Sequence, residues 1–140
     1  MSSSAPTDSP AAVEPAPFDP YDFPSDLLAA QRTAAELFAA LHELQARLPW
    51  SREPHPGWPE ETERGRERPG RPASPGWPEK DAAEYDRLFE ELREATATVQ
   101  CHRWWARCKK EGAALVDARQ KLKHAKGAVP PAPGGAGAAT

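Results

Sequence analysis

The stretch SDLLAAQRTAAELFAALHELQARL, residues 25–48, decides the fold class of this chain. Its apolar residues recur in alternating steps of three and four, which places them along one face of an α-helix. Ser25 and Asp26 suit the start of a helix, and Pro49 ends it. We therefore predict one amphipathic helix about 36 Å long over these residues. The apolar seam consists of Leu27, Ala30, Ala34, Leu37, Leu41, Leu44 and Leu48, with Phe38 beside it.

A second helix is predicted over residues 78–110. Pro78 fits the first turn, and the acidic residues Glu79 and Asp81 favour the positive end of the helix dipole. Its seam consists of Tyr85, Leu88, Leu92, Ala95 and Val99, with Phe89 beside it. The two stripes can pack against each other as an antiparallel hairpin or short coiled coil. Gly112 then breaks the pattern, and residues 113–126 predict a short third helix, so the expected fold class is all-α.

Residues 49–77 join the two long helices and form a long Pro-rich linker, too rich in proline for regular structure. The segment contains an internal repeat, RxxxPGWPE, at residues 52–60 and again at 71–79. A turn followed by Trp and Pro-Glu is a physical way to open a helix. We interpret Trp58 and Trp77, with Trp50, as side chains that pin the linker over the helix ends. The alternative is a pair of linear docking motifs.

Both ends of the chain lack the apolar content of a folded domain. Residues 1–24 are rich in Ala, Pro and Ser, with four acidic side chains and no basic one, so we expect a disordered acidic tail. Residues 127–140 form a second expected disordered tail of Pro, Gly and Ala, which leaves a helical domain over 25–126. A secretory signal and a run of about 18 apolar residues are both absent, so we expect a cytoplasmic protein with no membrane contact.

The sequence CHRWWARC, residues 101–108, lies where the helical region changes from acidic to basic. Residues 79–100 contain seven acidic and three basic side chains, whereas residues 101–126 contain eight basic and two acidic ones. Steps of three and four from Val99 miss Trp104 and Trp105, which therefore lie on another face. This Trp-bearing basic face either completes the core or offers an anchor to a partner. The candidate partner-binding residues are Trp104, Trp105, Arg103, Arg107, Lys109, Lys110, Trp58 and Trp77.

The cysteines do not predict a metal or redox site. On one continuous helix, Cys101 and Cys108 would lie about 10.5 Å apart, beyond the reach of a disulfide. The chain has no second Cys or His pair at zinc-ligand spacing, so we expect free thiols, no metal and no cofactor. Free thiols also fit a reducing cytoplasm.

The sequence predicts a protein that is not an enzyme, because it has no Gly-rich phosphate loop, GxSxG elbow or HExxH motif. We expect a noncatalytic protein–protein interaction module, regulatory or adaptor, that acts through the helical hairpin and its Trp-bearing basic face. Its protein partner is not identified, and a homodimer would strengthen two modest apolar stripes. The alternative is a nucleic-acid-binding accessory protein whose basic C-terminal helices neutralise phosphates. A pI near 5.8 makes the alternative the weaker hypothesis.

The order of these segments resembles a family of small uncharacterised actinobacterial helical proteins. The resemblance lies in the leucine-seam helix ending in LPW, the linker with PGW, the EEL segment, the HRWWA turn and the ARQKLKHA segment. It covers about residues 25–125, and its most specific parts are 102–106 and 118–125. The resemblance implies a helical fold of this plan, and it brings no activity, ligand or catalytic residue with it.

Overall fold

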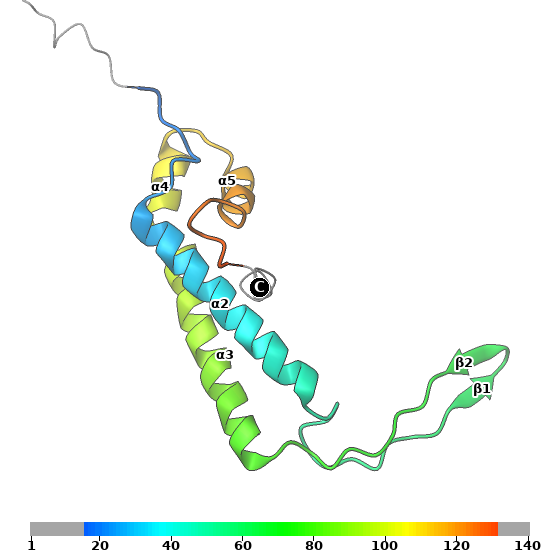
Figure 1. The fold of residues 1–140 in the computed structure, drawn as a ribbon. Coiled ribbons are helices and arrows are strands. Elements are labelled where there is room, and N and C mark those ends of the chain that lie inside the picture. Colours follow the sequence, from blue (N-terminus) through cyan, green and yellow to red (C-terminus); the bar gives the residue numbers. More distant parts are fainter. Residues whose placement is uncertain (1–15, 132–140) are drawn as a thin grey trace, which may run out of the picture.

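The computed structural model describes residues 16–131 as a mostly helical chain built on a long antiparallel hairpin (Figure 1). Two short helices cover the end of the hairpin where the first helix begins, and a thin arm leaves the opposite end (Figure 1). The elements are α2 (Ser25–Arg47), β1 (Glu61–Glu63), β2 (Arg66–Arg68), α3 (Glu79–Gln100), α4 (Arg103–Lys110) and α5 (Leu115–Leu122).

Helix α2 follows the prediction closely, apart from the way it begins. Its buried residues all belong to the predicted seam, and they are Leu27, Ala34, Leu41 and Leu44. Ser25 is the first helical residue and not a side-chain cap, because Pro24 occupies the cap position. The Pro24 carbonyl accepts the backbone N–H groups of Leu27 and Leu28 at 3.1 and 3.0 Å. One backbone carbonyl therefore accepts two N–H groups of the first turn, and no side chain caps this helix end.

The single helix predicted over residues 78–110 is wrong, because the chain breaks into α3 and α4 at Cys101 and His102. His102 caps α4, since its Nδ1 accepts the backbone N–H of Trp104 at 3.0 Å. Its Nε2 lies 3.1 Å from the carboxylate of Asp26 in the first turn of α2. The change of face after Val99 is thus a change of helix direction, held in place against the start of α2.

The core has two parts, and the larger one reaches into segments that were predicted to be tails. Phe23 is 8% exposed and Ala128 is 1% exposed, so residues 16–24 and residues 127–131 each contribute a residue to the core. The remainder of both predicted disordered tails lies outside the described residues. The larger cluster is Phe23, Leu27, Val99, Trp105, Cys108, Ala118, Leu122 and Ala128. The smaller cluster, toward the arm, is Leu41, Leu44 and Leu88.

The third helix is also shorter than predicted, because α5 covers only Leu115–Leu122 of the expected 113–126. Gly112 has a φ of +79°, and at this residue the chain turns away from the axis of α4, in agreement with the break predicted there. After α5 the backbone continues in turns, in which the N–H of Ala128 bonds the carbonyl of Ala125 at 3.0 Å. These turns bring Ala128 into the core.

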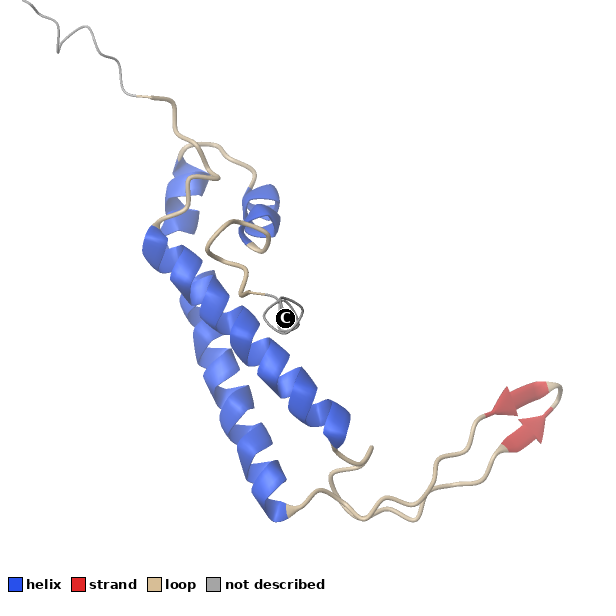
Figure 2. Cartoon of the chain, viewed as in Figure 1, coloured by secondary structure: helices blue, strands red, loops and turns tan. Residues whose placement is uncertain are grey.

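The linker is ordered as an antiparallel ribbon, so the all-α class holds for the body of the protein and not for this arm. The arm, residues 49–78, projects away from the helices and ends in β1 and β2 (Figure 2). Closer to the body, His55 pairs with Ser74, and Trp58 pairs with Arg71. In every pair, the two residues lie the same number of positions before and after the turn between β1 and β2. The ribbon therefore keeps one register along its length.

The RxxxPGWPE repeat explains why so proline-rich a segment can pair. The two copies run antiparallel, and the fourth residue of each copy makes the same bond. His55 Nδ1 accepts the N–H of Gly57 at 2.9 Å, and Ser74 Oγ accepts the N–H of Gly76 at 3.1 Å. Both glycines have a positive φ, +76° and +84°. A Cβ at Gly57 would overlap the carbonyl oxygen of Arg71 in the other copy, so the close approach of the two copies requires glycine there.

Candidate interaction surface

Trp105 is part of the core, and it also lines a groove between α2, α3 and α5. Its side chain is 4% exposed, and its Nε1 donates to the Val99 carbonyl oxygen at 2.6 Å. The ring of Phe23 meets it edge-on at 6.4 Å, and the Arg119 guanidinium lies 5.2 Å above its ring. These contacts join α4 to α5, to the end of α3 and to the segment before α2. Of the two roles open to it on sequence grounds, Trp105 therefore completes the core.

Trp104 is half-buried beneath the segment that precedes α2. Its ring centroid lies 5.1 Å from that of Phe18, and its Nε1 donates to the carbonyl oxygen of Pro20 at 3.2 Å. The guanidinium of Arg107 covers the outer side of Phe18 at 4.9 Å. The two tryptophans therefore do not form a joint exposed face, as the Trp-bearing basic face required.

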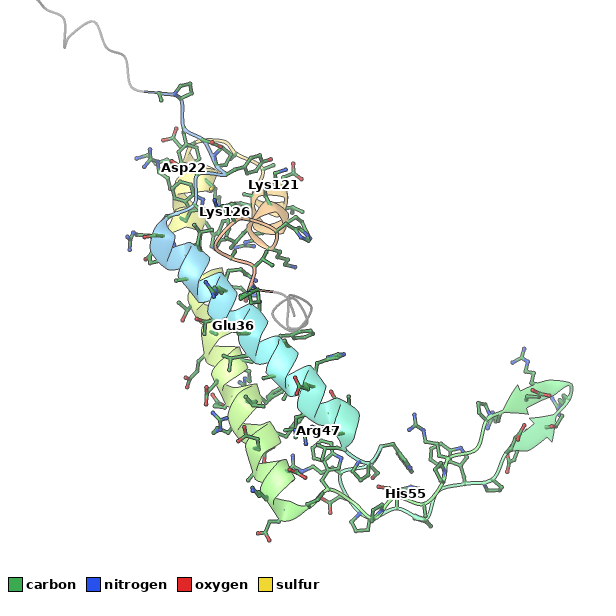
Figure 3. All side chains as sticks on the ribbon, in the orientation of Figure 1. Asp22, Glu36, Arg47, His55, Lys121 and Lys126 are labelled. Carbon is green, nitrogen blue, oxygen red and sulfur yellow. The ribbon has the colours of Figure 1, made fainter. Side chains whose placement is uncertain are left out.

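The basic residues around them do remain at the surface. Arg103, Lys109 and Lys110 are exposed on α4, and Arg107 is exposed beside Glu111, with 3.2 Å between Nε and Oε2. Lys121 and Lys126 lie at the same end of the molecule (Figure 3). This basic end is therefore a set of solvated charges without a pair of free aromatic rings.

Trp77 and Trp58 belong to the arm, which leaves the hairpin at the end opposite α4, the helix that contains Trp104 (Figure 1). Trp77 Nε1 donates to the Pro49 carbonyl oxygen at 2.8 Å, and its ring lies 4.9 Å from that of Tyr85. Trp58 Nε1 donates to the Pro69 carbonyl oxygen at 3.2 Å, while 46% of the residue stays exposed. Trp77 therefore ties the base of the arm to the start of α3, as the pinning interpretation expected, whereas Trp58 joins the two sides of the arm away from the helix ends.

An ion pair also fixes the base of the arm to α3. The Arg52 guanidinium binds both carboxylate oxygens of Asp86, at 2.7 and 2.8 Å, and lies 5.4 Å from the centre of the Trp77 ring. This bidentate pair holds the pKa of the Asp86 carboxyl below its usual range. The arm thus leaves the body in a defined direction.

A groove on one face of the hairpin is the surface that sequence reasoning missed. It lies between α2, α3 and α5 and has a volume of about 700 Å³. Phe38 is 56% exposed and Val116 is 71% exposed along it. The sequence had assigned Phe38 and Phe89 to stripes that pack on each other, yet both rings stay at the surface. Its lining includes Ala35 and Phe38 of α2, Leu92 of α3, Val116 and Arg119 of α5, and Lys123 at the α5 C-cap.

The titratable groups of the described residues do not form a reactive cluster. Cys101 is exposed, Cys108 is buried, and both are free thiols. Burial raises the pKa of the Cys108 thiol, so this sulfur stays protonated at neutral pH. Within residues 16–131, no group of three or more His, Cys, Asp or Glu side chains is placed to hold a metal ion.

The geometry defines a small helical-hairpin protein with a β-ribbon arm and an apolar groove on the hairpin face. The chain belongs to the family described as a domain of unknown function, DUF8825, whose family model matches residues 26–125. The match agrees with the resemblance drawn from the sequence in its extent and in bringing no function. Comparison with curated proteins and with solved structures gave no match. Among the helices described, none has the length and apolarity to cross a membrane.

Proposed function

We propose that this protein is a noncatalytic protein–protein interaction module, regulatory or adaptor, that binds its partner in the groove. The observation that supports this proposal is the exposure of Phe38 and Val116 along one continuous hollow. Contiguous apolar surface on a small domain marks interaction sites, whereas scattered single residues do not. The groove thus replaces the Trp-bearing basic face as the contact surface in this proposal.

The chemistry of the groove favours an amphipathic helix with acidic flanks as the bound element. Ala35, Phe38 and Leu92 give it an apolar floor, and the spacing between two packed helices suits the apolar face of a third. Arg119 and Lys123 stand at the α5 side and favour negative charge on the partner. Two free thiols support a reducing, cytoplasmic location as part of the same proposal.

Nucleic-acid binding is the second candidate, and the exposed side chains of Arg103, Lys109 and Lys110 are the observation that favours it. The packing of the tryptophans weighs against it. Trp105 is in the core, and Phe18 covers Trp104, so neither ring offers a free face for base stacking. A protein partner in the groove therefore accounts for more of the exposed apolar surface.

The test is a pull-down from lysate of the native organism with nuclease present, using the tagged full chain and matched valine variants. Val116→Ser alters the groove, whereas Val129→Ser alters an equally apolar side chain, 51% exposed, that does not line it. We expect protein partners that survive nuclease, are retained by Val129→Ser, and are lost with Val116→Ser or Phe38→Ser. Partners that disappear with nuclease, or that ignore the groove variants, would contradict the proposal.

A further inference from the structure

We infer that the groove binds the α3 face of a second copy of this chain, in a two-fold antiparallel dimer of hairpins. The inference rests on the proposed function, since it names the partner of the same surface. Three observations support it: the chemistry of α3, the charge at the two ends of the molecule, and the thin core near the arm.

Helix α3 has the properties that the groove favours in a bound helix. It contains seven acidic and three basic side chains, and Phe89 stands 44% exposed on it. Phe89 lies one helical turn from Leu92, which lines the groove, and its ring stacks on Tyr85 with centroids 6.0 Å apart. The apolar floor therefore continues from the groove along α3 to Phe89. In a two-fold pair, Phe89 of each copy covers the floor around Phe38 of the other.

The charges of the molecule select the antiparallel orientation. The start of α3, with Glu79 and Asp81 in its first turn, lies at the arm end, and α5 lies toward the opposite end (Figure 1). Helix α5 has Arg119 and Lys121 in its last turn and Lys123 at its C-cap. Two hairpins packed head to tail place each α5 beside the start of the partner's α3, so opposite charges meet at both ends. A parallel pair would place like charges together at each end, which opposes association.

The arm half of the hairpin also has little core of its own. Its buried apolar residues are Leu41, Leu44 and Leu88, while Phe38 and Phe89 beside them remain exposed. A two-helix layer gains stability when a second layer covers its open face, as in four-helix bundles. The second copy supplies that layer with the same residues, because a two-fold contact is made by one surface used twice.

Sedimentation equilibrium of the full chain tests the dimer. We expect a reversible dimer whose dissociation constant rises on the order of 100-fold or more in Phe89→Ser and in Phe38→Ser, because each substitution removes two rings from a two-fold contact. Both rings are exposed on the single chain, so neither substitution should change the helix content measured by circular dichroism. Val129→Ser is the matched control and should stay dimeric. A dimer whose affinity is unaffected by Phe38→Ser and Phe89→Ser would overturn the assignment to this face.

Chemical cross-linking tests the orientation. Lys123→Cys and Asp81→Cys chains, each also carrying Cys101→Ser, are mixed and treated with a flexible bismaleimide. Antiparallel packing predicts cross-links between position 123 of one chain and position 81 of the other in excess of like pairs. Predominant 123–123 cross-links would overturn the antiparallel arrangement. The buried Cys108 sulfur should not react while the chain is folded.

The dimer and the proposed function fail in different ways. A chain that sediments as a monomer at every concentration overturns the second copy as the occupant. If partners captured in the pull-down are still lost with Val116→Ser, the groove retains its proposed role with a different protein.

Discussion

Replacement of Trp105 separates a core residue from a binding anchor. Trp105→Ala removes a ring that is 4% exposed, which costs about 3–5 kcal/mol when the cavity stays open. It also removes the indole N–H that donates to the Val99 carbonyl at 2.6 Å, although this carbonyl keeps a second donor in the backbone N–H of His102 at 3.3 Å. The lost hydrogen bond therefore adds about 0.5–1.5 kcal/mol, the net value of one such bond, to the cost of the cavity. We expect a loss of about 4–6 kcal/mol in the free energy of unfolding.

The neighbouring tryptophan is the matched control. Trp104 is half-buried and its hydrogen bond to the Pro20 carbonyl is 3.2 Å long, so Trp104→Ala should cost about 1–2 kcal/mol. Trp105→Phe keeps an aromatic ring near Phe23 and loses the indole donor, so its cost should fall between those of the two alanine variants. Urea unfolding followed by far-ultraviolet circular dichroism measures all three, because helix content reports on the whole domain.

The outcome that would refute this reasoning is a small stability loss at Trp105 together with a large binding loss. If Trp105→Ala unfolds within about 1 kcal/mol of the wild type and abolishes partner capture, then Trp105 is an anchor. A loss large enough to leave the chain unfolded at room temperature would still agree with the core assignment. Trp105→Phe then supplies the measurable value.

Three further parts of the molecule can be tested: the arm, the hydrogen bond between His102 and Asp26, and the two thiols. Gly57→Ala should disrupt the ribbon, seen as faster amide exchange at Trp58 and His55, because a Cβ there overlaps the Arg71 carbonyl; Gly65→Ala has a similar φ of +78° with open space around it and should leave both amides protected. The His102 hydrogen bond lowers the pKa of Asp26 from 3.8, so its stabilising effect is complete above that pH and is lost as pH falls through the lowered pKa. In Asp26→Asn this contribution to the loss of stability in acid should be absent when the free energy of unfolding is measured with urea at pH values from above 3.8 downward. The same dependence of unfolding free energy on pH in the variant and the wild type would contradict this prediction. In maleimide labelling Cys101 should react at once, while burial and a raised pKa should protect Cys108 until the chain unfolds; equal rates would place Cys108 at the surface.

The long helices were predictable because their evidence is local. The seam in residues 25–48 fixes one face of α2, and the structure ends that helix at Arg47, one residue before the predicted end. Helix α3 begins at Glu79, directly after the proline that was expected to start it. An apolar pattern repeated over more than twenty residues predicts a helix even where single residues have low helix propensity.

The break at Cys101 and His102 could not be predicted in the same way. The segment contains no glycine or proline, and its propensities allow a helix to continue. What ends α3 is a set of contacts distant in sequence: His102 bonds Asp26, and Trp105 packs against Phe23. Residues 16–24 were assigned to a tail for the same reason, since one buried phenylalanine does not show in composition.

The arm was missed because its pairing depends on two copies of one motif. The repeat is visible in the sequence, and the prolines argue against a strand in either copy taken alone. In the structure, backbone hydrogen bonds between the two copies do not involve every residue. They recur at every third residue of the first copy, at Arg52, His55 and Trp58, and the prolines lie between these positions. Proline has no backbone N–H, so it is tolerated at positions where no carbonyl of the opposite strand requires a hydrogen-bond donor.

The distribution of aromatic residues supports the groove as the contact surface of the proposed dimer. At the α4 end, Phe18 and Phe23 lie against the two tryptophans, and at the arm end Trp77 lies against Tyr85. Phe38 and Phe89, in the middle of the hairpin, remain about half exposed, at 56% and 44%. A chain with so small a core would gain stability by burying both rings. In the proposed dimer the second copy covers them, and its acidic α3 meets the basic residues beside the groove.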